Sequence, residues 1–195
     1  YLTGGEPTLL PDLPRWIRGL TDLGYDVKVL SNGIKLTDRA YCEELKAAGC
    51  RWLLLQTDTM APDALTALRG PKSMSRVREE ALENLVSLGF EIDLACMIDR
   101  NFNMGDMGDL IRLGFDLPGV RHVSLMPSRR LGRGLLTTDE NLLDEVEMMR
   151  AIEEQTHGMI RYHDWLLFFA AMHAVHRVTG DPDFATRRCF LPLPL

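Results

Sequence analysis

The sequence contains few cysteines, and no two of them stand close enough to form a familiar ligand or redox motif. The four are Cys42, Cys50, Cys96 and Cys189. The C-x-x-C spacing of zinc ribbons and of thioredoxin-like sites is therefore missing. This cysteine usage predicts a reducing, cytoplasmic setting.

An excess of positive charge and a long apolar run are also missing. Lys and Arg total 22 against 28 Asp and Glu, and the net charge of −6 offers no basic footprint for nucleic acid. The longest apolar run, residues 165–172, is far below the roughly 20 residues that span a bilayer. We expect it to be a buried helix, and we expect neither nucleic acid nor a membrane as a partner.

The composition that is present is that of an ordinary globular protein. The 195 residues are 46% hydrophobic and 26% charged, with 16 Gly and 10 Pro. These values exclude intrinsic disorder, collagen-like repeats and coiled coil. The length predicts one domain with, at most, an appendage.

A unit of strand, polar loop, helix and glycine recurs along the first two thirds of the chain. Four glycines each precede an apolar residue, which is typical of a helix that ends in a left-handed glycine before a strand begins. They are Gly24, Gly49, Gly89 and Gly114. The apolar runs that follow them predict strands over residues 27–30, 52–55, 92–98 and 120–126, with residues 2–3 as the tail of an earlier strand.

Helical periodicity fills the segments between these runs. Apolar residues at spacings i, i+3, i+4 and i+7 predict one buried helix face in each of two segments. The two sets are Leu13, Trp16, Ile17 and Leu20, and Val77, Ala81, Leu85 and Leu88. Thr37 is a candidate N-cap for a helix through Leu45, and Asp139 for one through Leu142 and Met149.

Repeated βα units predict an α/β fold with parallel strands and right-handed crossovers. A complete eight-unit barrel needs about 250 residues, so the chain holds a partial (β/α) TIM-type barrel of about five units. We expect this partial barrel over residues 1–135. A C-terminal helical extension follows over residues 136–195, with helices to about residue 156 and over about 164–178 and an irregular Pro-rich tail.

Polar residues follow each expected strand. They fall at residues 4–7, 31–33, 56–58, 99–103 and 127–130. Polar loops are common after strands, and Asn-Gly alone forms a turn. Because ligands bind at the carboxyl ends of parallel strands, the five loops together nevertheless predict one converging site.

The first of these loops has the most specific chemistry. Gly4 and Gly5 open the backbone to a ligand, and Glu6 beside them can accept a hydrogen bond from an ammonium group. Loops that hold phosphate lack such a carboxylate and add Lys or a glycine pattern at a helix start. The loop therefore indicates a binding site for an amino-acid-like group.

The run from Leu2 through Gly4-Gly5-Glu6-Pro7 to Leu9, followed by a helix and by Val27 to Gly33, resembles radical S-adenosylmethionine (SAM) enzymes. Leu68-Arg69-Gly70, placed in a loop, agrees with this resemblance, which covers about residues 1–135. The sequence is similar to the branch that contains the molybdenum-cofactor cyclase, peptide maturases and archaeal-type pterin methyltransferases. The residues present do not separate these three.

The resemblance implies a set of cofactor-binding residues. Gly4, Gly5 and Glu6, followed by Pro7, match the motif that binds the methionyl amino group of SAM. Positions that contact the ribose or the methionine carboxylate in relatives match Ser31, Asn32, Gln56 and Asp58. Positions nearer the adenine and ribose match Asn101 or Asn103, Met126 and Pro127.

The sequence departs from the family in one respect, because the Cys-x3-Cys-x2-Cys that holds the 4Fe-4S cluster is absent. Three thiolates must converge on one cluster, and the spacing of the four cysteines does not allow this. We expect the chain to begin inside the second strand, with the cluster ligands upstream of Tyr1. On this interpretation the 195 residues shape part of the SAM pocket and are inactive alone.

The resemblance implies an enzyme that cleaves SAM reductively and abstracts a substrate hydrogen through a 5′-deoxyadenosyl radical. It implies a small-molecule or peptide substrate and a reducing partner such as flavodoxin or ferredoxin. The alternative is a degenerate module without a cluster that serves as a binding or scaffold protein. The catalytic residues stay unassigned.

For other polar residues the sequence gives weaker indications of a role in binding. Asp99, Arg100, Arg129 and Arg130 are candidates for substrate contact, or for ordinary surface roles. His163, His173 and His176 have a spacing compatible with a metal site. On so apolar a helix we interpret them as packing or surface residues, and we expect no metal ligands within the chain.

Overall fold

The computed structural model describes residues 1–70, 74–129, 142–179 and 192–194. These divide into two compact units. The first contains Tyr1–Cys96 and Leu110–Ser124 with the last residues of the chain, and the second contains Met97–Asp109 and Leu125–Pro192. The expected boundary near residue 135 lies outside the described residues. No helix in the described part of the chain is long and apolar enough to cross a membrane.

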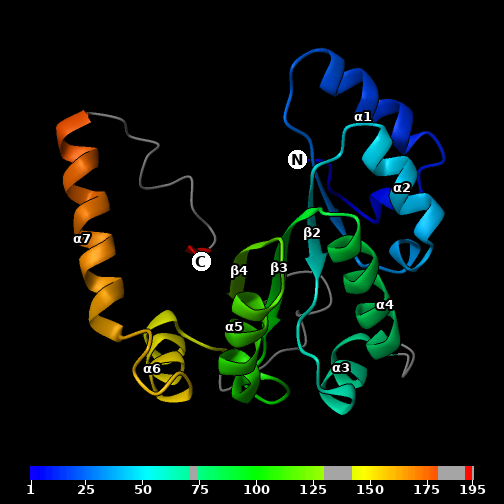
Figure 1. Cartoon of the computed structure of the whole chain (residues 1–195). Helices are drawn as coiled ribbons and strands as arrows, with labels where there is room; N and C mark the ends of the chain where they lie inside the picture. Colours follow the sequence, from blue (N-terminus) through cyan, green and yellow to red (C-terminus); the bar gives the residue numbers. More distant parts are fainter. Residues whose placement is uncertain (71–73, 130–141, 180–191, 195) are drawn as a thin grey trace. The chain divides into compact units, whose positions relative to one another are not determined.

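The described residues form a five-stranded sheet with strand order β1-β2-β3-β4-β5, of which β2, β3 and β4 are labelled in Figure 1. Its strands are β1 (Lys28–Ser31), β2 (Trp52–Gln56), β3 (Glu91–Ile98), β4 (Val120–Pro127) and β5 (Pro192–Pro194). The four runs predicted as strands are confirmed to within about two residues. The tail, expected to be irregular, contributes the three residues of β5.

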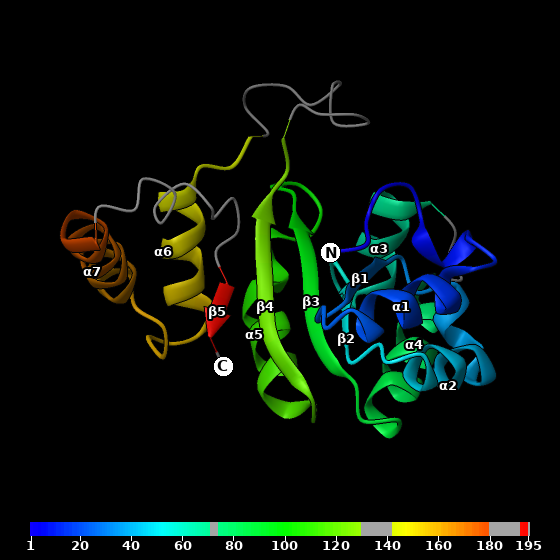
Figure 2. The same cartoon turned by 90° about the horizontal axis from the view of Figure 1, so that it is seen from above.

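The strands β1 to β4 pair in parallel, as repeated βα units require. Lys28 lies opposite Trp52 in β1 and β2, and Leu54 lies opposite Asp93 in β2 and β3. Leu2 forms a parallel bridge with Val29, which matches the strand tail expected at residues 2–3. Two hydrogen bonds join the ends of β3 and β4, from Ile92 N to Gly119 O (2.9 Å) and from Ser128 N to Ile98 O (2.7 Å). Figure 2 shows these two long strands side by side.

Helices separate the strands along the chain. They are α1 (Leu13–Asp22), α2 (Arg39–Ala47), α3 (Pro62–Arg69), α4 (Met74–Ser87), α5 (Met107–Asp116), α6 (Glu145–Gln155) and α7 (Tyr162–Thr179). Short 3-10 turns lie at Pro7–Leu9, Lys35–Thr37 and Met104–Asp106 (η1, η2 and η3). Helix α3 was not anticipated, and it places Arg69 at a helix end and not in a loop.

Two helix caps differ from the prediction. Asp38, and not Thr37, caps α2, because its carboxylate accepts a hydrogen bond from Tyr41 N (3.3 Å). Asp144 caps α6 by accepting from Glu147 N (2.7 Å). The predicted cap at residue 139 lies outside the described residues. In both helices a carboxylate in extended conformation satisfies a backbone N–H that the helix itself leaves unpaired.

Gly24, Gly49 and Gly89 all have positive φ after a helix, as predicted. The prediction for Gly114 is wrong, because this residue lies inside α5. Gly119, with a φ of +85°, ends the connection between α5 and β4 instead. An added Cβ there lies 2.5 Å from Phe90 O, so the chain needs glycine for a close approach as well as for its backbone angle.

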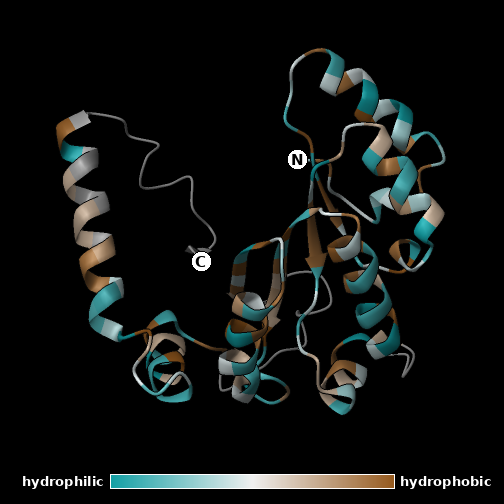
Figure 3. Cartoon of the chain, in the orientation of Figure 1, coloured by the Kyte–Doolittle hydropathy of each residue, from teal (hydrophilic) through white to brown (hydrophobic). Residues whose placement is uncertain are grey.

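In the first unit the two faces of the sheet differ. Alternate residues on one face are fully buried, and examples are Val29, Leu53, Ile92, Leu94 and Val123. This apolar face packs against the helices, and Figure 3 shows β2 as largely hydrophobic. The opposite face carries partly exposed residues such as Lys28, Trp52 and His122.

The buried faces of α1 and α4 differ slightly from the predicted faces. In α1, Leu13 and Ile17 are buried but Trp16 is 60% exposed. In α4 the buried set is Met74, Arg78, Ala81, Leu82 and Leu85. Val77 and Leu88 are only partly buried. An arginine therefore occupies a position on the buried face of α4 that the apolar pattern had not included.

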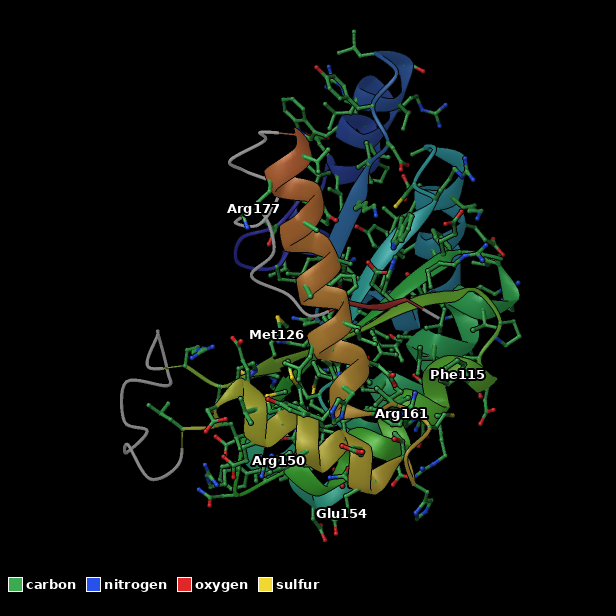
Figure 4. All side chains as sticks on the ribbon, turned by 90° about the vertical axis from the view of Figure 1, so that its left-hand side faces the viewer. Phe115, Met126, Arg150, Glu154, Arg161 and Arg177 are labelled. Atoms are coloured by element: carbon green, nitrogen blue, oxygen red, sulfur yellow. The ribbon has the colours of Figure 1, made fainter. Side chains whose placement is uncertain are left out.

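The second unit contains the last residues of β3 and β4, from Met97 and from Leu125, together with α6 and α7. Met148, Met149 and Ile152 form the buried face of α6. Figure 4 shows Arg150 and Glu154 on its exposed side. In α7, Trp165 is buried while Leu166 and Leu167 are 47% and 69% exposed, so the prediction that the apolar run forms a fully buried helix is wrong.

Candidate functional site

Glu6 is the centre of a hydrogen-bond group at the carboxyl end of β1, which we call the Glu6 group: Glu6, Thr8, Ser31 and Asn32. One carboxylate oxygen accepts from Thr8 N (3.2 Å), Thr8 Oγ1 (2.6 Å) and Ser31 Oγ (2.9 Å). The other accepts from Asn32 N at 2.6 Å. Glu6 also caps η1, whose first residue is Pro7. The structure thus brings three of the predicted cofactor residues together, namely Glu6, Ser31 and Asn32.

Gly4 and Gly5 precede Glu6 with φ values of +99° and +39°. An added Cβ at either position meets no atom within 4 Å. The two glycines are therefore required by backbone angle, while the space around them is open. Backbone N–H and C=O groups here are accessible to a ligand without side-chain obstruction.

Arg78 holds the loop after β1 from the helix side. Its Nη1 donates a hydrogen bond to the carbonyl oxygen of Asn32. The side chain is fully buried, and its Nε and Nη2 have no hydrogen-bond partner among the described residues. Burial lowers the pKa of the guanidinium, an effect that the nearby Asp58 carboxylate opposes. Asn32 is thus held between an anion on its N–H and a cation on its carbonyl.

The end of β2 forms a second polar group in the same unit. Asp58 has a φ of +60° and a side chain with 0% exposure. Arg69 donates to both of its carboxylate oxygens, from Nε at 2.7 Å and from Nη2 at 2.9 Å. With its amide oxygen turned toward Arg69, Gln56 accepts from Nη2 at 2.7 Å. Gln56 and Asp58 are therefore joined through Arg69.

The remaining predicted residues lie in the second unit. Asn103 is buried, accepts from Asp99 N (2.7 Å) and donates to Met97 O (2.8 Å). Asn101 contributes its backbone N–H to Asp99 Oδ1 at 3.0 Å. Met126, seen in Figure 4, and Pro127 are the last two residues of β4. Asn103 thus shapes the turn after β3.

The candidates for substrate contact are largely occupied by partners within the second unit. Asp99 accepts from Ser128 Oγ at 3.2 Å. Arg100 pairs with Glu147, with Nη2 to Oε2 at 2.6 Å, and Arg129 pairs with Glu145 at 3.4 Å. Arg130 lies outside the described residues.

The described cysteines are buried thiols. Desolvation raises the pKa of Cys42 to about 11 and that of Cys50 to about 12, and it also raises the pKa of Cys96. Metal and cluster ligation needs thiolates, so these three residues do not fit an iron–sulfur cluster. Among the described residues no group of three or more His, Cys, Asp or Glu side chains is placed to hold a metal ion. The side chains of His173 and His176, and all of Cys189, lie outside the described part.

Sequence reasoning missed four residues that the structure makes prominent: Arg69 as a partner of Asp58, the buried Arg78, and the pair of Asp93 and His122. Asp93 Oδ1 lies 2.8 Å from His122 Nδ1. One signal was available, because Asp93 is a lone carboxylate within an apolar strand, which needs a partner when buried. Nothing in the sequence next to Arg69 indicated that it would pair with Asp58.

The chain is similar to several known proteins. The family model described as Radical SAM superfamily matches residues 1–114. The 7,8-dihydro-6-hydroxymethylpterin dimethyltransferase of Methanocaldococcus jannaschii is 32% identical over 170 residues, which cover 83% of this chain and 33% of that protein. A probable GTP 3',8-cyclase of Saccharolobus islandicus is 32% identical over 155 residues, covering 78% of this chain and 47% of the relative. The chain thus spans between a third and about half of the length of these relatives.

Two solved structures share the fold. A structure of TYW1 with a lysine-pyruvate adduct bound has a TM-score of 0.57 and 20% identity, covering 77% of this chain and 48% of that one. A crystal structure of archaeal TYW1 has a TM-score of 0.53 and 19% identity, covering 79% and 48%. They agree with an α/β fold that forms part of a TIM-like barrel. With the family match over residues 1–114, the conclusion is that the chain belongs to the radical SAM superfamily.

Proposed function

We propose that the protein is a radical SAM enzyme and that this chain forms the part of it that holds the methionyl end of SAM. The observation that carries the proposal is the Glu6 group, in which Ser31 and Asn32 fix the Glu6 carboxylate beside two open glycines. A carboxylate held in this way attracts an ammonium group and orients it. Backbone groups at Gly4 and Gly5 supply further hydrogen bonds.

The chain's own residues divide the work of binding. Glu6 accepts hydrogen bonds from the methionyl ammonium, and its fixed rotamer avoids an entropic cost when SAM binds. Arg69, neutralised by Asp58 and oriented by Gln56, presents a guanidinium at the end of β2. From the family resemblance alone, we assign Asn101, Asn103, Met126 and Pro127 to the adenine and ribose of SAM.

When bound, SAM and a 4Fe-4S cluster supply a 5′-deoxyadenosyl radical that abstracts hydrogen from the substrate. Cys42, Cys50 and Cys96 do not fit the cluster, so we assign its ligands to other cysteines of the complete gene product. A reducing partner of the flavodoxin or ferredoxin class supplies the electron. The family relationship favours this enzyme over a scaffold module without a cluster.

Two relatives suggest the substrate class. One is named for a pterin and the other for GTP. Pterin and guanine share a 2-amino-4-oxopyrimidine ring, a flat lactam with an N–H and a carbonyl side by side. We propose a substrate that contains this ring.

The test of the SAM assignment is Glu6→Gln in the protein expressed from its complete gene. Loss of the charge-assisted hydrogen bond, worth about 1.5–3 kcal/mol, weakens SAM binding at least tenfold in calorimetry. The matched control is Glu80→Gln, which removes a charge from an exposed i,i+4 pair with Arg76. An affinity of Glu6→Gln equal to that of the control contradicts the assignment.

Iron content tests the rest of the proposal. After anaerobic reconstitution, the complete protein should bind four iron atoms, the number in a 4Fe-4S cluster. Variants Cys50→Ala and Cys96→Ala should keep the same iron content. Failure of the complete protein to bind iron would support the scaffold alternative. Loss of iron in either variant contradicts our assignment of the ligands.

A further inference from the structure

The sheet face opposite the helices carries a row of polar and aromatic side chains in the first unit. Lys28, Trp52, Asp93 and His122 come from β1, β2, β3 and β4 in turn. Paired residues of parallel strands point to the same face, and the register pairs Lys28 with Trp52 and Leu54 with Asp93. His122 lies on the same face because its ring contacts Asp93.

Asp93 and His122 form an oriented pair. The distance from Asp93 Oδ1 to His122 Nδ1 is 2.8 Å, and the exposed fractions of the two side chains are 9% and 32%. A carboxylate only accepts hydrogen bonds, so Nδ1 carries the proton and Nε2 of the neutral ring is an acceptor. The structure shows no hydrogen bond to Nε2 among the described residues.

Trp52 supports the imidazole from the side. The two rings are stacked, with centroids 5.7 Å apart and an interplanar angle of 14°. The ammonium of Lys28 lies 3.1 Å from the Trp52 ring centroid and fixes that ring in turn. His122 is therefore held by a hydrogen bond and by a flat ring, while its acceptor atom stays without a partner.

Asp93 and His122 are each the third residue of an eight-residue strand, but the neighbouring strand β2 ends only a short way further along the sheet. Ala95 pairs with Gln56, and Asp93 is two residues before Ala95 on the same face. Two residues of strand correspond to about 7 Å. A small ring that contacts His122 can thus extend toward the carboxyl ends of β2 and β3.

We infer that Asp93 and His122 recognise the substrate, with His122 Nε2 accepting a hydrogen bond from the ring N–H of a flat lactam heterocycle. This inference rests on the proposed function. A ring whose corresponding nitrogen is itself an acceptor places two lone pairs against each other and is rejected. Sites built around such a hydrogen bond discriminate strongly against the analogue that lacks it.

Two probes that differ at this nitrogen test the inference in the complete protein. At pH 7, 6-hydroxymethylpterin presents a lactam N–H, whereas 2,4-diamino-6-hydroxymethylpteridine presents a bare ring nitrogen. Calorimetry in the presence of SAM should show at least tenfold tighter binding of the first probe. His122→Phe keeps a flat ring against Trp52 and should bind both probes within about threefold of each other, because the acceptor is gone.

His163→Phe is the matched control, since His163 is an exposed histidine of the second unit. It should keep the wild-type preference. A wild-type protein without the preference, or a His122→Phe variant that retains it, overturns the inference. Affinity for SAM is measured in the same samples: normal SAM binding with no probe preference refutes only this inference, whereas absent SAM binding refutes the proposed function.

Discussion

Replacing Arg78 by methionine separates the stability of the fold from its function. Arg78 is a cation with 0% exposure that donates one hydrogen bond, to Asn32 O, while Nε and Nη2 have no partner among the described residues. A buried polar group without a partner costs about 1–3 kcal/mol. Burial of the charge adds to this cost, since desolvation already lowers the pKa of the group.

Methionine is also unbranched, although shorter than arginine, and it has no polar group to satisfy. Buried ionic groups replaced by apolar residues of similar volume leave stability unchanged or raise it by about 1–4 kcal/mol. The lost hydrogen bond from a charged donor opposes this by about 1.5–3 kcal/mol. We expect the free energy of unfolding of Arg78→Met to change by between about −3 and +2.5 kcal/mol, measured by urea denaturation of the complete protein.

Binding of SAM should weaken in this variant whether or not its stability changes. Without Arg78 the carbonyl of Asn32 loses its anchor, and Asn32 N no longer holds Glu6 Oε2 in a fixed place. We expect about tenfold weaker SAM binding, equivalent to about 1.4 kcal/mol. The control is Arg76→Met, an exposed arginine of the same helix. Destabilisation of Arg78→Met by more than about 3 kcal/mol, or unchanged SAM affinity, refutes the reasoning.

Two further predictions concern stability alone. Gly119→Ala should lower the free energy of unfolding by at least about 2 kcal/mol, because the added Cβ lies 2.5 Å from Phe90 O and the residue has a φ of +85°. Gly105→Ala is the control and should be nearly neutral, because its added Cβ meets no atom within 4 Å. Equal effects of the two substitutions in thermal denaturation contradict the prediction. Stability should fall as pH rises above 9, since unfolded Cys50 loses its proton near its ordinary pKa of 9.0 while the folded thiol keeps it to about 12. Each such group contributes a slope of about 1.4 kcal/mol per pH unit, and an equally steep fall in Cys50→Ala refutes its role.

The sequence predicted most of the architecture because it is encoded locally. Apolar runs separated by glycines gave the four main strands, and three of the four glycine positions have the predicted positive φ. Gly114 failed because a glycine before an apolar residue also occurs inside a helix, and the true end, Gly119, follows a proline instead. Local pattern alone does not distinguish these two cases.

The candidate site was predicted only in part. Ser31 and Asn32 were placed beside Glu6 by their position after a strand, and the hydrogen bonds agree. The same pattern gave no sign that Arg78 donates to Asn32 from a helix 46 residues away along the chain. Trp16 lies on the predicted apolar face of its helix but is exposed. The periodic pattern identifies an apolar face, but it does not say which edge of that face a neighbouring element covers.

By itself, the sequence determined the βα order, the strand positions and the Gly-Gly-Glu motif, since these depend on near neighbours and on backbone preferences. The tertiary structure decided which polar side chains pair. Arg69 with Asp58, and Asp93 with His122, are joined across 11 and 29 residues of sequence. Such pairs form only when separate elements pack together, because a polar side chain that is buried without its partner costs free energy.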